Sequence, residues 1–424
     1  MQLLEEFRWG GILTNASEGI EELFAGAGAT GYIGFDPSAA SLHVGSLLPV
    51  MALARFQRHG HRPIAVVGGG TGLIGDPSGK TEERKLLTRE EIDSNLQGLR
   101  KQLRRFLDFE AKSNPALMVN NADWLVPMSL MSFLRDLGKH FTVNYMVSKE
   151  SVKRRLEQEE GISFTEFSYM LLQAYDFLHL FDTYGCRLQM GGSDQWGNIT
   201  AGMDLVGRVR KAQVHGLVFP LVTTVSGVKF GKTEAGTVWL DPELTSPYRF
   251  YQFWFNTDDR DVLGYLKFFT WLEKREVEEL AQSLEGAPER REAQIRLARE
   301  VTKMVHGPTA LEKAERASKA LFGEEIRELT AEEIGEVFFD TPSGEIPRSK
   351  LLGGGMPLSD LLPQAGLAQS KSEARRLIES GGIYINNSRI TDPKKSVAIS
   401  DVLAGQFVIL RRGAREFRVL RLLP

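Results

Sequence analysis

The feature that most constrains this fold is an alternation of short β-type runs with helical periodicity in the N-terminal half. The run 31–35 reads as a strand, 42–58 has the spacing of an amphipathic helix, and 64–67 is a second, compact apolar run. Parallel strands need a crossover connection, which is usually a helix, so this order predicts an α/β fold with a Rossmann-like parallel sheet. Later strands are expected at 188–190 and 217–222.

Changes in composition divide the chain into segments. Residues 1–225 are predicted to form the sheet domain, and 226–246 a loop region around a Lys-Phe-Gly-Lys-Thr sequence. Isolated apolar positions among Glu, Arg, Lys and Ala predict a helical domain over 247–340. Prolines and consecutive glycines predict a linker without helix or strand at 341–355, which leaves 356–424 as a small C-terminal domain.

Composition excludes several classes of protein. Hydrophobic residues make up 42% and charged residues 25% of the 424 residues, which is typical of a globular chain and excludes a disordered one. A single cysteine, Cys186, excludes an intrachain disulfide and favours a reducing compartment. Since the sequence has neither an apolar run of about 18 residues nor a basic N-terminal leader, we expect a cytoplasmic protein.

The net charge of −3 conceals an asymmetry along the chain. The last 74 residues carry 11 Lys or Arg and 6 Asp or Glu, a balance of +5, so the first 350 residues carry −8. The C-terminal domain is therefore a basic module, which favours a partner with negative charge.

Two matches to the dinucleotide fingerprint G-x-G-x-x-G begin at Gly26 and Gly70. That fingerprint needs a preceding strand, a following helix and an acidic residue about 20 residues further on. The first match precedes its strand, and the second leads into a turn and the polar segment 81–97. The sequence from Gly75 to Thr81 resembles a P-loop, but three residues separate its glycines instead of four. These departures argue against a nicotinamide-dependent enzyme, which ranks third among the alternative functions for the chain.

A more specific signal is the segment from Gly34 to Ser46, which joins the end of a strand to the start of a helix. The free N–H groups and the positive end of a helix bind anions, so this junction favours phosphate. Gly45 would let a purine or ribose lie directly on the backbone, and His43 offers a hydrogen-bond donor to phosphate oxygens. Taken alone, His43 could equally cap the helix or pack against it.

The sequence Lys229-Phe-Gly-Lys232-Thr233 is a second candidate anion site. It places two ammonium groups and a hydroxyl around a flexible glycine after a predicted strand. Such a loop can clamp polyphosphate through charge-assisted hydrogen bonds. On its own, a pair of lysines on a surface turn is more often solvated charge, so the pairing with the His43 segment decides the interpretation.

The helix expected at 164–181 carries polar residues on one face. Tyr169, Gln173 and Asp176 are spaced i, i+4 and i+7, so they share one face of an otherwise apolar helix. Buried polar atoms need hydrogen-bond partners, and this stripe suits a small amino acid with ammonium and phenol groups. A buried network that satisfies itself is the alternative.

A glycine-rich segment at 191–198 follows another predicted strand. Its glycines permit close approach of a ligand to the backbone. Asp194 and Gln195 in this segment could bind ribose hydroxyls or the headgroup of an α-amino acid.

In this order, these motifs resemble the bacterial-type tyrosyl-tRNA synthetases over nearly the whole chain. The His43 and Lys232 segments resemble the two signatures of class I aminoacyl-tRNA synthetases, with the consensus spellings His-Ile-Gly-His and Lys-Met-Ser-Lys-Ser. Further matching segments are Tyr32-Ile-Gly-Phe-Asp-Pro, Gly72-Leu-Ile-Gly-Asp-Pro-Ser-Gly-Lys80, Val143-Asn-Tyr-Met, the 164–181 helix and 191–198. Two departures are Ser46, where the signature usually has its second histidine, and Ser38, where many relatives have threonine.

The resemblance implies three sets of site residues. Those that would bind tyrosine are Tyr32, Asp76, Tyr169, Gln173, Asp176 and Gln195, of which Gln195 would also belong to the adenylate side. Those that would bind ATP are Asp36, Ser38, His43, Gly45, Ser46, Asp194 and Lys232. The catalytic residues, most of which would gather on the pyrophosphate in the transition state, would be His43, Lys80, Arg84, Lys229, Lys232 and Thr233.

The implied activity is that of a tyrosine–tRNA ligase. The tyrosine carboxylate attacks the α-phosphate of ATP to give tyrosyl-adenylate and pyrophosphate, and a 2′- or 3′-hydroxyl of tRNA(Tyr) then takes the tyrosyl group. Because a carboxylate is already a nucleophile, the first step needs positioning and charge stabilisation rather than a general base. Mg²⁺ is expected on the ATP phosphates, with no metal held by the protein.

The basic tail resembles an S4-type RNA-binding domain through its motifs between residues 356 and 387. Lys371, Arg375 and Arg376 are the candidate contacts to RNA phosphates. Phosphate contacts position RNA without reading its sequence, so base recognition would fall elsewhere, such as to the helical region, which the resemblance makes an anticodon-binding domain. A solvated basic face is the alternative.

Members of the resembled family are typically homodimers with an interface that involves the segment matching 133–142, so we expect a homodimer without membrane attachment.

Two rival functions remain besides the nicotinamide enzyme. A non-catalytic RNA-binding protein could keep the fold, but it would not need the phosphate clamp of His43 and Lys232. A tryptophanyl-tRNA synthetase shares the fold but ordinarily lacks an S4-like tail.

Overall fold

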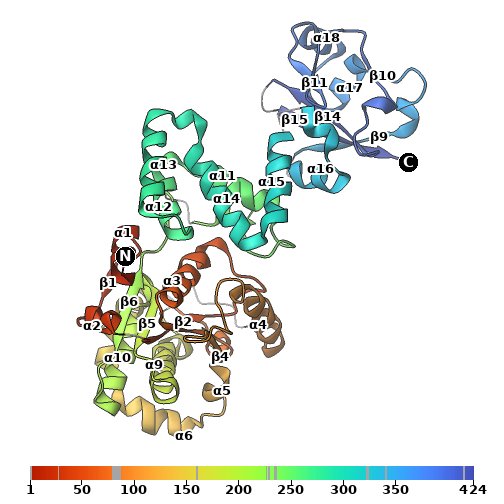
Figure 1. Cartoon of the computed structure of the whole chain (residues 1–424). Helices are drawn as coiled ribbons and strands as arrows, with labels where there is room; N and C mark the ends of the chain where they lie inside the picture. Colours follow the sequence, from red (N-terminus) through yellow and green to blue (C-terminus); the bar gives the residue numbers. More distant parts are fainter. Residues whose placement is uncertain are drawn as a thin grey trace. The chain divides into compact units, whose positions relative to one another are not determined.

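The computed structural model describes residues 2–26, 28–78, 87–158, 161–225, 227, 230–233, 236–320, 324–339, 341–413 and 416–424. The chain forms two compact units, which Figure 1 draws together. The first comprises Met1–Leu244 with Thr257–Leu297, and the second comprises Thr245–Asn256 with Ala298–Pro424. The division into five segments expected from composition stays a prediction.

A six-stranded sheet forms the centre of the first unit. Its order is β1-β6-β5-β2-β3-β4, with parallel pairing except for the antiparallel edge strand β1. The strands are β1 (Asn15–Ala16), β2 (Thr30–Phe35), β3 (Arg62–Val67), β4 (Leu117–Asn120), β5 (Leu188–Gly192) and β6 (His215–Phe219). The predicted Rossmann-like parallel sheet is confirmed. The strand expected to reach residue 222 ends at Phe219, because Pro220 has no N–H to continue the ladder.

The helix expected at 42–58 begins later than its pattern indicates. A short 3₁₀ turn, η1 (Val44–Ser46), precedes α3 (Leu47–Arg58). The chain before it is extended, because Leu42 and Val44 make main-chain hydrogen bonds with Leu240 and Val238. The periodicity of the sequence gives no sign of this pairing, because Val238 and Leu240 lie nearly 200 residues further along the chain. The result is that the His43 segment is itself part of a small β-type contact.

Helices α9 (Phe164–Tyr184) and α10 (Trp196–Arg210) pack side by side against the sheet (Figure 1). Met170, Ala174 and Phe177 of α9 join Tyr32 and other sheet residues in one buried core. Helix α9 ends at Tyr184, and Gly185 after it takes the left-handed conformation of a helix C-cap. The predicted 164–181 helix is therefore confirmed, one turn longer than expected.

Further helices complete the first unit. They are α1 (Leu3–Gly10), α2 (Ile20–Ala25), α4 (Arg89–Leu103), α5 (Ala122–Leu125), α6 (Leu130–Ser132), α7 (Val143–Val147), α8 (Glu150–Leu156), α12 (Asp259–Phe269) and α13 (Lys274–Gly286). Helix α12 packs on α1 and α3. A short hairpin of β7 (Lys232–Thr233) and β8 (Gly236–Thr237) carries the second predicted anion segment.

The second unit combines helices with a small sheet. Its helices are α11 (Pro247–Phe255), the part of α14 (Glu292–His306) from Ala298 onward, α15 (Pro308–Ala320), α16 (Ala331–Val337), α17 (Leu358–Gln364) and α18 (Lys371–Glu379). Its five-stranded sheet has the order β12-β11-β14-β15-β9, and β10 (Met356–Pro357) pairs separately with β13 (Ser396–Val397). This confirms helices over much of 247–340 and an α+β C-terminal region.

The predicted linker at 341–355 contains structure that composition did not indicate. Strand β9 (Ser343–Pro347) pairs in parallel with β15 (Glu416–Leu423), the last strand of the chain. The expectation of no strand there is wrong, because an edge strand tolerates a proline at its end and its partner supplies the hydrogen bonds. The other strands of this sheet are β11 (Ile383–Ile385), β12 (Ser388–Ile390) and β14 (Phe407–Arg412).

None of the described helices is both long enough and apolar enough to cross a bilayer.

Candidate active site

A cavity of about 290 Å³ lies where β2, β3 and β5 end and α9 passes the sheet. This is the edge at which open parallel sheets bind ligands. Ten of the predicted site residues line it: Tyr32, Asp36, Ser38, Gly45, Ser46, Asp76, Tyr169, Gln173, Asp176 and Gln195. The structure thus brings together residues that are up to 163 positions apart, from Tyr32 to Gln195, in the printed sequence.

The predicted polar stripe of α9 faces this cavity. Tyr169, Gln173 and Asp176 all line it, and Tyr169 and Asp176 are almost fully buried. Ser163 caps the helix by accepting a hydrogen bond from the N–H of Glu166. Burial, together with the Asp36 and Asp76 carboxylates, raises the pKa of Tyr169 well above its usual value, so this phenol stays protonated and donates.

Asp36, at the carboxyl end of β2, is held from two sides. The Tyr169 hydroxyl donates to its Oδ2 at 2.9 Å, and the Thr71 hydroxyl donates to its Oδ1 at 2.8 Å. An ionised carboxylate accepts through both oxygens, so these two bonds fix its orientation toward the cavity. The sequence indicated Asp36 and Tyr169, but it gave no indication of Thr71.

Asp76 and Gln173 belong to a second polar group in the cavity wall. The Gln195 amide donates to Asp76 Oδ2 at 2.7 Å, and the Ser78 N–H donates to Oδ1 at 2.9 Å. Asn198 donates to Gln173 Oε1 at 2.9 Å. The oxygens of Asp76 and Gln173 are acceptors that suit an ammonium group, which carries three donors.

Asp176 lies deeper and has two donors from one segment. The Trp124 indole N–H donates to Oδ1 at 2.7 Å, and the Asn121 amide donates to Oδ2 at 3.0 Å. Burial raises the pKa of the Asp176 carboxyl to about 7, although these two hydrogen bonds act in the opposite direction. The carboxyl group is therefore poised between its neutral and ionised forms near neutral pH.

Tyr32 is the most informative residue of the cavity. It is 1% exposed, and its ring packs edge-on against Phe177 with centroids 5.5 Å apart. Within the part of the chain that the structure describes, its hydroxyl has no hydrogen-bond partner. Burial and the Asp176 carboxylate raise the pKa of Tyr32 well above its usual value. A buried, neutral and unpaired hydroxyl in a cavity wall indicates a site for a polar ligand atom.

The predicted phosphate-binding turn has a defined local geometry. The Gly45 N–H donates to Nδ1 of His43 at 3.0 Å, so His43 caps the 3₁₀ turn. Because Nδ1 accepts, Nε2 carries the proton of the neutral ring and is the atom that can donate. A Cβ at Gly45 would lie 2.7 Å from the His43 ring, so only glycine fits there. Capping and phosphate binding are thus compatible roles for His43.

The sequence from Lys229 to Thr233 is called the lysine segment below. Its described residues, 230–233, lie against the turn that follows His43. Gly231 has a φ of +78°, and a Cβ there would approach Val44 Cγ2 to 2.7 Å. The two signature-like segments are therefore adjacent in the structure. Lys232 donates to the Thr237 hydroxyl at 2.9 Å, and the Thr233 hydroxyl donates to the Gly236 carbonyl at 3.1 Å.

Some predicted residues lie away from the cavity wall or outside the description. The cavity-lining set does not include His43, Asp194, Lys232 or Thr233. Asp194 lies beside it in the turn η5 (Ser193–Gln195), between β5 and α10. Lys80, Arg84 and Lys229 fall on residues that the structure does not describe, so their roles stay predictions.

Four residues with a place in the site were missed: Thr71, Asn121, Trp124 and Asn198. Asn121 follows β4 directly, and its side chain bonds Asp176, Thr71 and the Gly70 N–H. A polar residue at the carboxyl end of a parallel strand is a usable signal, but strand 117–120 was not recognised in the sequence. The buried side chain of Gln189, on β5, also lines the cavity.

The predicted RNA-contact residues lie on α18 of the second unit. Ser370 caps this helix by accepting from the Glu373 N–H. Arg375 and Arg376 are exposed, whereas Lys371 forms an ion pair with Asp360 at 3.0 Å. The two arginines are therefore more available to an anionic partner than Lys371 is.

Among the described residues, no group of three or more His, Cys, Asp or Glu is arranged to hold a metal ion.

Comparison with protein families gives two matches. Residues 27–323 match the model described as tRNA synthetases class I (W and Y). Residues 333–420 match the model of the tyrosine–tRNA ligase SYY-like C-terminal domain. Together the two matches span most of both structural units.

Known proteins similar to the chain include bacterial and mitochondrial enzymes. A tyrosine–tRNA ligase of Roseiflexus castenholzii is 58% identical over 420 residues, which cover 99% of each chain. One from Geobacillus kaustophilus is 54% identical over 424 residues, covering 99% of this chain and 100% of the relative. The crystal structure of a C-terminally truncated Aspergillus nidulans mitochondrial tyrosyl-tRNA synthetase superposes with a TM-score of 0.69 at 30% identity, covering 76% of this chain and 94% of that one.

Proposed function

This chain belongs to the class I tRNA synthetases of the tryptophan and tyrosine group, and from that premise we propose how its residues carry out the activity of a tyrosine–tRNA ligase. The enzyme activates L-tyrosine with ATP to tyrosyl-adenylate and pyrophosphate. It then transfers the tyrosyl group to the 3′ end of tRNA(Tyr). The assignment of single residues to these steps is the proposal.

The tyrosine ring enters the cavity with its phenol toward Tyr32 and Asp176. The unpaired Tyr32 hydroxyl is the single observation that carries this assignment. A ligand phenol has one O–H to donate to the Asp176 carboxylate and lone pairs that accept from the Tyr32 hydroxyl. Binding would thereby satisfy the only ring hydroxyl of this wall that lacks a partner among the described residues.

Phenylalanine fits the same space but fails to satisfy these groups. It would bury Asp176 beside a ring with no donor and leave Tyr32 unpaired. Rejection of an analogue that lacks a hydroxyl is the principle for which tyrosyl-tRNA synthetases are themselves the standard example. The pocket discriminates because it is polar at its closed end.

The ammonium group lies at the other end of the ligand, near Asp76, Tyr169 and Gln173. Gln195 keeps Asp76 oriented, and Asn198 keeps Gln173 oriented. An ammonium held by a carboxylate and an amide oxygen is a charge-assisted arrangement. It leaves the tyrosine carboxylate directed to the mouth of the cavity, where Gly45 and Ser46 line the wall.

ATP occupies the mouth of the site. We assign its ribose and phosphates to Asp36, Ser38, His43, Gly45, Ser46, Asp194 and Lys232. The main-chain N–H groups at the start of α3 and the Nε2 donor of His43 favour negative charge there. Ser46, which replaces the usual second histidine, retains a hydroxyl donor for this contact.

The attacking tyrosine carboxylate forms a bond to the α-phosphorus as the bond to the bridging oxygen of pyrophosphate breaks. Negative charge then accumulates on the leaving pyrophosphate. Lys232 and Thr233, with Lys80, Arg84 and Lys229, are proposed to stabilise that charge. Mg²⁺ on the ATP phosphates, held mainly by substrate oxygens, would neutralise part of it.

The second unit is proposed to bind tRNA. Arg375 and Arg376 on α18 supply phosphate contacts, with Lys371 as a weaker third contact because Asp360 already pairs with it. The helices over 247–340, which fall partly in the first unit and partly in the second, are assigned to the anticodon region. In this proposal the enzyme is cytoplasmic.

We also propose that the enzyme is a homodimer. The segment 133–142 and its flanks carry several exposed apolar side chains, namely Leu130, Met131, Leu134 and Val143, which are 50–69% exposed. Adjacent exposed apolar residues of this size are typical of an interaction surface. Sedimentation at micromolar concentration should give twice the mass of the 47.4 kDa chain, and a single 47.4 kDa species would refute the proposal.

Pyrophosphate exchange into ATP without tRNA tests the assignment of the pocket. Purified protein with Mg²⁺ is assayed with tyrosine, phenylalanine and tryptophan in parallel. Exchange with tyrosine alone is expected. Exchange with tryptophan would move the chain to the other branch of its family, and a folded protein without any exchange would leave RNA binding as its activity.

A further inference from the structure

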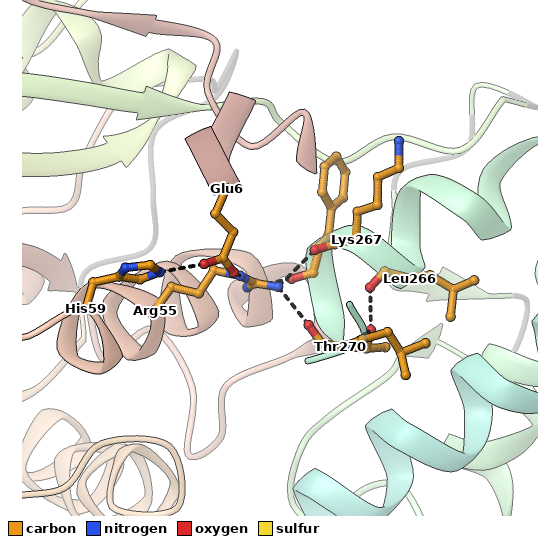
Figure 2. Close-up of polar contacts among 8 residues, drawn as sticks. Glu6, Arg55, His59, Leu266, Lys267 and Thr270 are labelled. Atoms are coloured by element: carbon orange, nitrogen blue, oxygen red, sulfur yellow. Dashed lines mark hydrogen bonds and ion pairs between the residues drawn. The ribbon is translucent and has the colours of Figure 1, made fainter. Parts of the chain in front are cut away.

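Arg55 closes the C-terminal end of α12 with its side chain (Figure 2). It is 3% exposed and lies in the last turn of α3. Its guanidinium donates to the main-chain carbonyls of Lys267, Phe268 and Thr270 at 2.9, 3.1 and 2.8 Å. These are carbonyls that a helix end leaves without internal partners, and a cation is favoured there.

A carboxylate from a third helix holds Arg55 in place. Glu6 of α1 accepts from Arg55 Nε at 2.9 Å through one oxygen and contacts His59 Nε2 at 2.7 Å through the other. Figure 2 shows this carboxylate between the two side chains. The buried guanidinium of Arg55 therefore donates four hydrogen bonds in fixed directions. These bonds hold α1, α3 and α12 to one another.

The same α12 holds the aromatic anchor of the lysine segment. Phe230 is buried, and its ring stacks on Phe269 with centroids 5.5 Å apart and planes 4° apart. It also meets Tyr265 edge-on at 5.0 Å. Phe269 is the last residue of α12, directly between the carbonyls of Phe268 and Thr270 that Arg55 binds.

Helix α3 is thus connected to both segments proposed to bind ATP, the His43 turn and the lysine segment. Its N-terminal end follows the His43 turn directly, and its C-terminal end carries Arg55. Through α12 and Phe230, Arg55 is connected to Gly231, which lies against Val44 in that same turn. The contacts therefore form a closed circuit within the first unit.

We propose that Arg55, held by Glu6, is a positioning residue for tyrosine activation, which sets where α12 holds Phe230 and hence where Lys232 meets the ATP phosphates. The inference rests on the proposed function, because Lys232 is assigned to the pyrophosphate there. Arg55 touches no residue of the tyrosine pocket in the contacts described. Its loss should therefore affect the rate of activation and spare tyrosine binding.

The test compares Arg55→Lys with Arg58→Lys, one turn apart on the same helix surface. Lysine keeps the positive charge but lacks the planar fork that reaches three carbonyls and Glu6. Arg58 is exposed and stacks on Trp271 at 4.2 Å, so it is a matched control. Arg55→Lys is expected to lower kcat for pyrophosphate exchange by roughly tenfold to a hundredfold, since small displacements of a catalytic group have effects of this size.

Two readouts separate positioning from general damage. The tyrosine Kd without ATP, measured by equilibrium dialysis, should stay within about twofold of the wild-type value, as expected when only transition-state contacts are lost. Trypsin cleavage after Lys232 should become faster in Arg55→Lys than in Val206→Ala, a core truncation in α10. Equal loss of kcat and tyrosine binding, or unchanged cleavage at Lys232, would overturn the proposal.

A softer variant covers the case in which Arg55→Lys does not fold. Glu6→Gln keeps the carbonyl contacts of Arg55 but removes its ionic partner, and a smaller loss of kcat with unchanged tyrosine Kd is expected. Unchanged kcat in Glu6→Gln would count against the proposal. If the wild-type protein lacks exchange altogether, the proposed function fails, whereas the cleavage comparison at Lys232 still decides whether Arg55 positions this segment.

Discussion

Gly231 lies so close to Val44 that a Cβ on the glycine would approach Val44 Cγ2 to 2.7 Å. Gly231 belongs to the lysine segment and Val44 to the turn that follows His43. The close approach depends on a left-handed backbone at Gly231, with a φ of +78°. Two segments about 190 residues apart in the chain therefore share one contact that any side chain would obstruct.

Replacement of Gly231 by alanine should separate these segments. We expect a loss of about 1–2 kcal/mol in stability from the left-handed backbone and a larger loss in the rate of adenylate formation. Tyrosine binding should be retained, because Gly231 does not line the cavity. Pre-steady-state adenylate formation and equilibrium dialysis measure the two quantities.

The matched control for this substitution is Gly227→Ala. Gly227 has a φ of +79°, but no atom lies within 4 Å of where its Cβ would be. Gly227→Ala should therefore lose a similar amount of stability but keep the wild-type rate of adenylate formation. Equal rates in both variants would show that the contact with Val44 has no role in activation.

Sequence patterns predicted the parts of this fold that local periodicity specifies. The parallel strands at 31–35 and 64–67 and the polar stripe of α9 are regular over a few turns or residues, so they could be read directly. Strand β9 could not, because its partner among the described residues is β15, some 70 residues further along the chain. Pairing at that distance leaves no pattern within the strand itself.

The candidate site was predictable to a similar extent. Asp176 was found from its spacing on α9, but its donors Asn121 and Trp124 lie more than 50 residues earlier, in a segment without a recognised motif. Only the register of β4 beside β3 brings them to the cavity. His43 was predicted as a phosphate donor or as a cap, and the structure adds that its Nδ1 caps while Nε2 can donate.

Tyr32→Phe should raise stability and lower affinity together. The Tyr32 hydroxyl is buried without a partner among the described residues, so its removal should stabilise the ligand-free protein by about 1 kcal/mol. The same change removes the hydrogen bond proposed between Tyr32 and the substrate phenol, so it should weaken tyrosine binding by about 1 kcal/mol. Urea unfolding and equilibrium dialysis should therefore move in opposite directions. A stability loss would mean that the hydroxyl has a partner in the free enzyme.

The ionisation of Asp176 should make tyrosine binding depend on pH. Its pKa is raised to about 7, and the phenol that we propose binds there would donate best to the ionised carboxylate. Affinity should therefore rise as the pH increases through about 7 and then level off, with a proton released on binding. Isothermal titration calorimetry in buffers of different ionisation enthalpy measures both effects. Asp176→Asn should bind tyrosine more weakly and lose this dependence.

The raised pKa of Asp176 should also make the stability of the protein change with pH in a definite direction. Because the folded carboxyl holds its proton to a higher pH than the unfolded one, the folded state binds more protons between about pH 4 and pH 7. The contribution of Asp176 to stability should therefore fall as pH rises through this window and stay constant above it. Wild-type unfolding free energies minus those of Asp176→Asn, measured in steps of pH, isolate this term. A difference that is independent of pH would contradict the raised pKa.

Asn121→Ala should damage both the fold and the pocket. Its amide donates to Asp176 at 3.0 Å and Thr71 at 3.0 Å and accepts from the Gly70 N–H at 2.8 Å, so buried partners are left unpaired. A stability loss of about 2–3 kcal/mol is expected, with weaker discrimination against phenylalanine. Asn114→Ala is the control, because Asn114 bonds the main-chain carbonyls of Gln57 and His61 instead. It should lower stability and leave discrimination intact.

The contribution of α18 to tRNA binding is best tested by point substitutions. A cut after Leu352 would leave β9 without β15 and remove Leu403, Ile409 and Val419 from the core that covers Ile334. Loss of charging in such a fragment would then reflect exposed apolar surface as well as lost RNA contacts.

Arg375→Gln with Arg376→Gln avoids that ambiguity, since both side chains are exposed. If each arginine meets one phosphate, the double variant should lower the slope of log affinity for tRNA against log salt by roughly two. Lys371→Gln should change it less, because Asp360 already pairs with Lys371 at 3.0 Å. Pyrophosphate exchange should be unchanged in the double variant and in Lys371→Gln, which separates RNA binding from activation. An unaltered salt slope in the double variant would mean that the phosphate contacts of tRNA are made by residues other than Arg375 and Arg376.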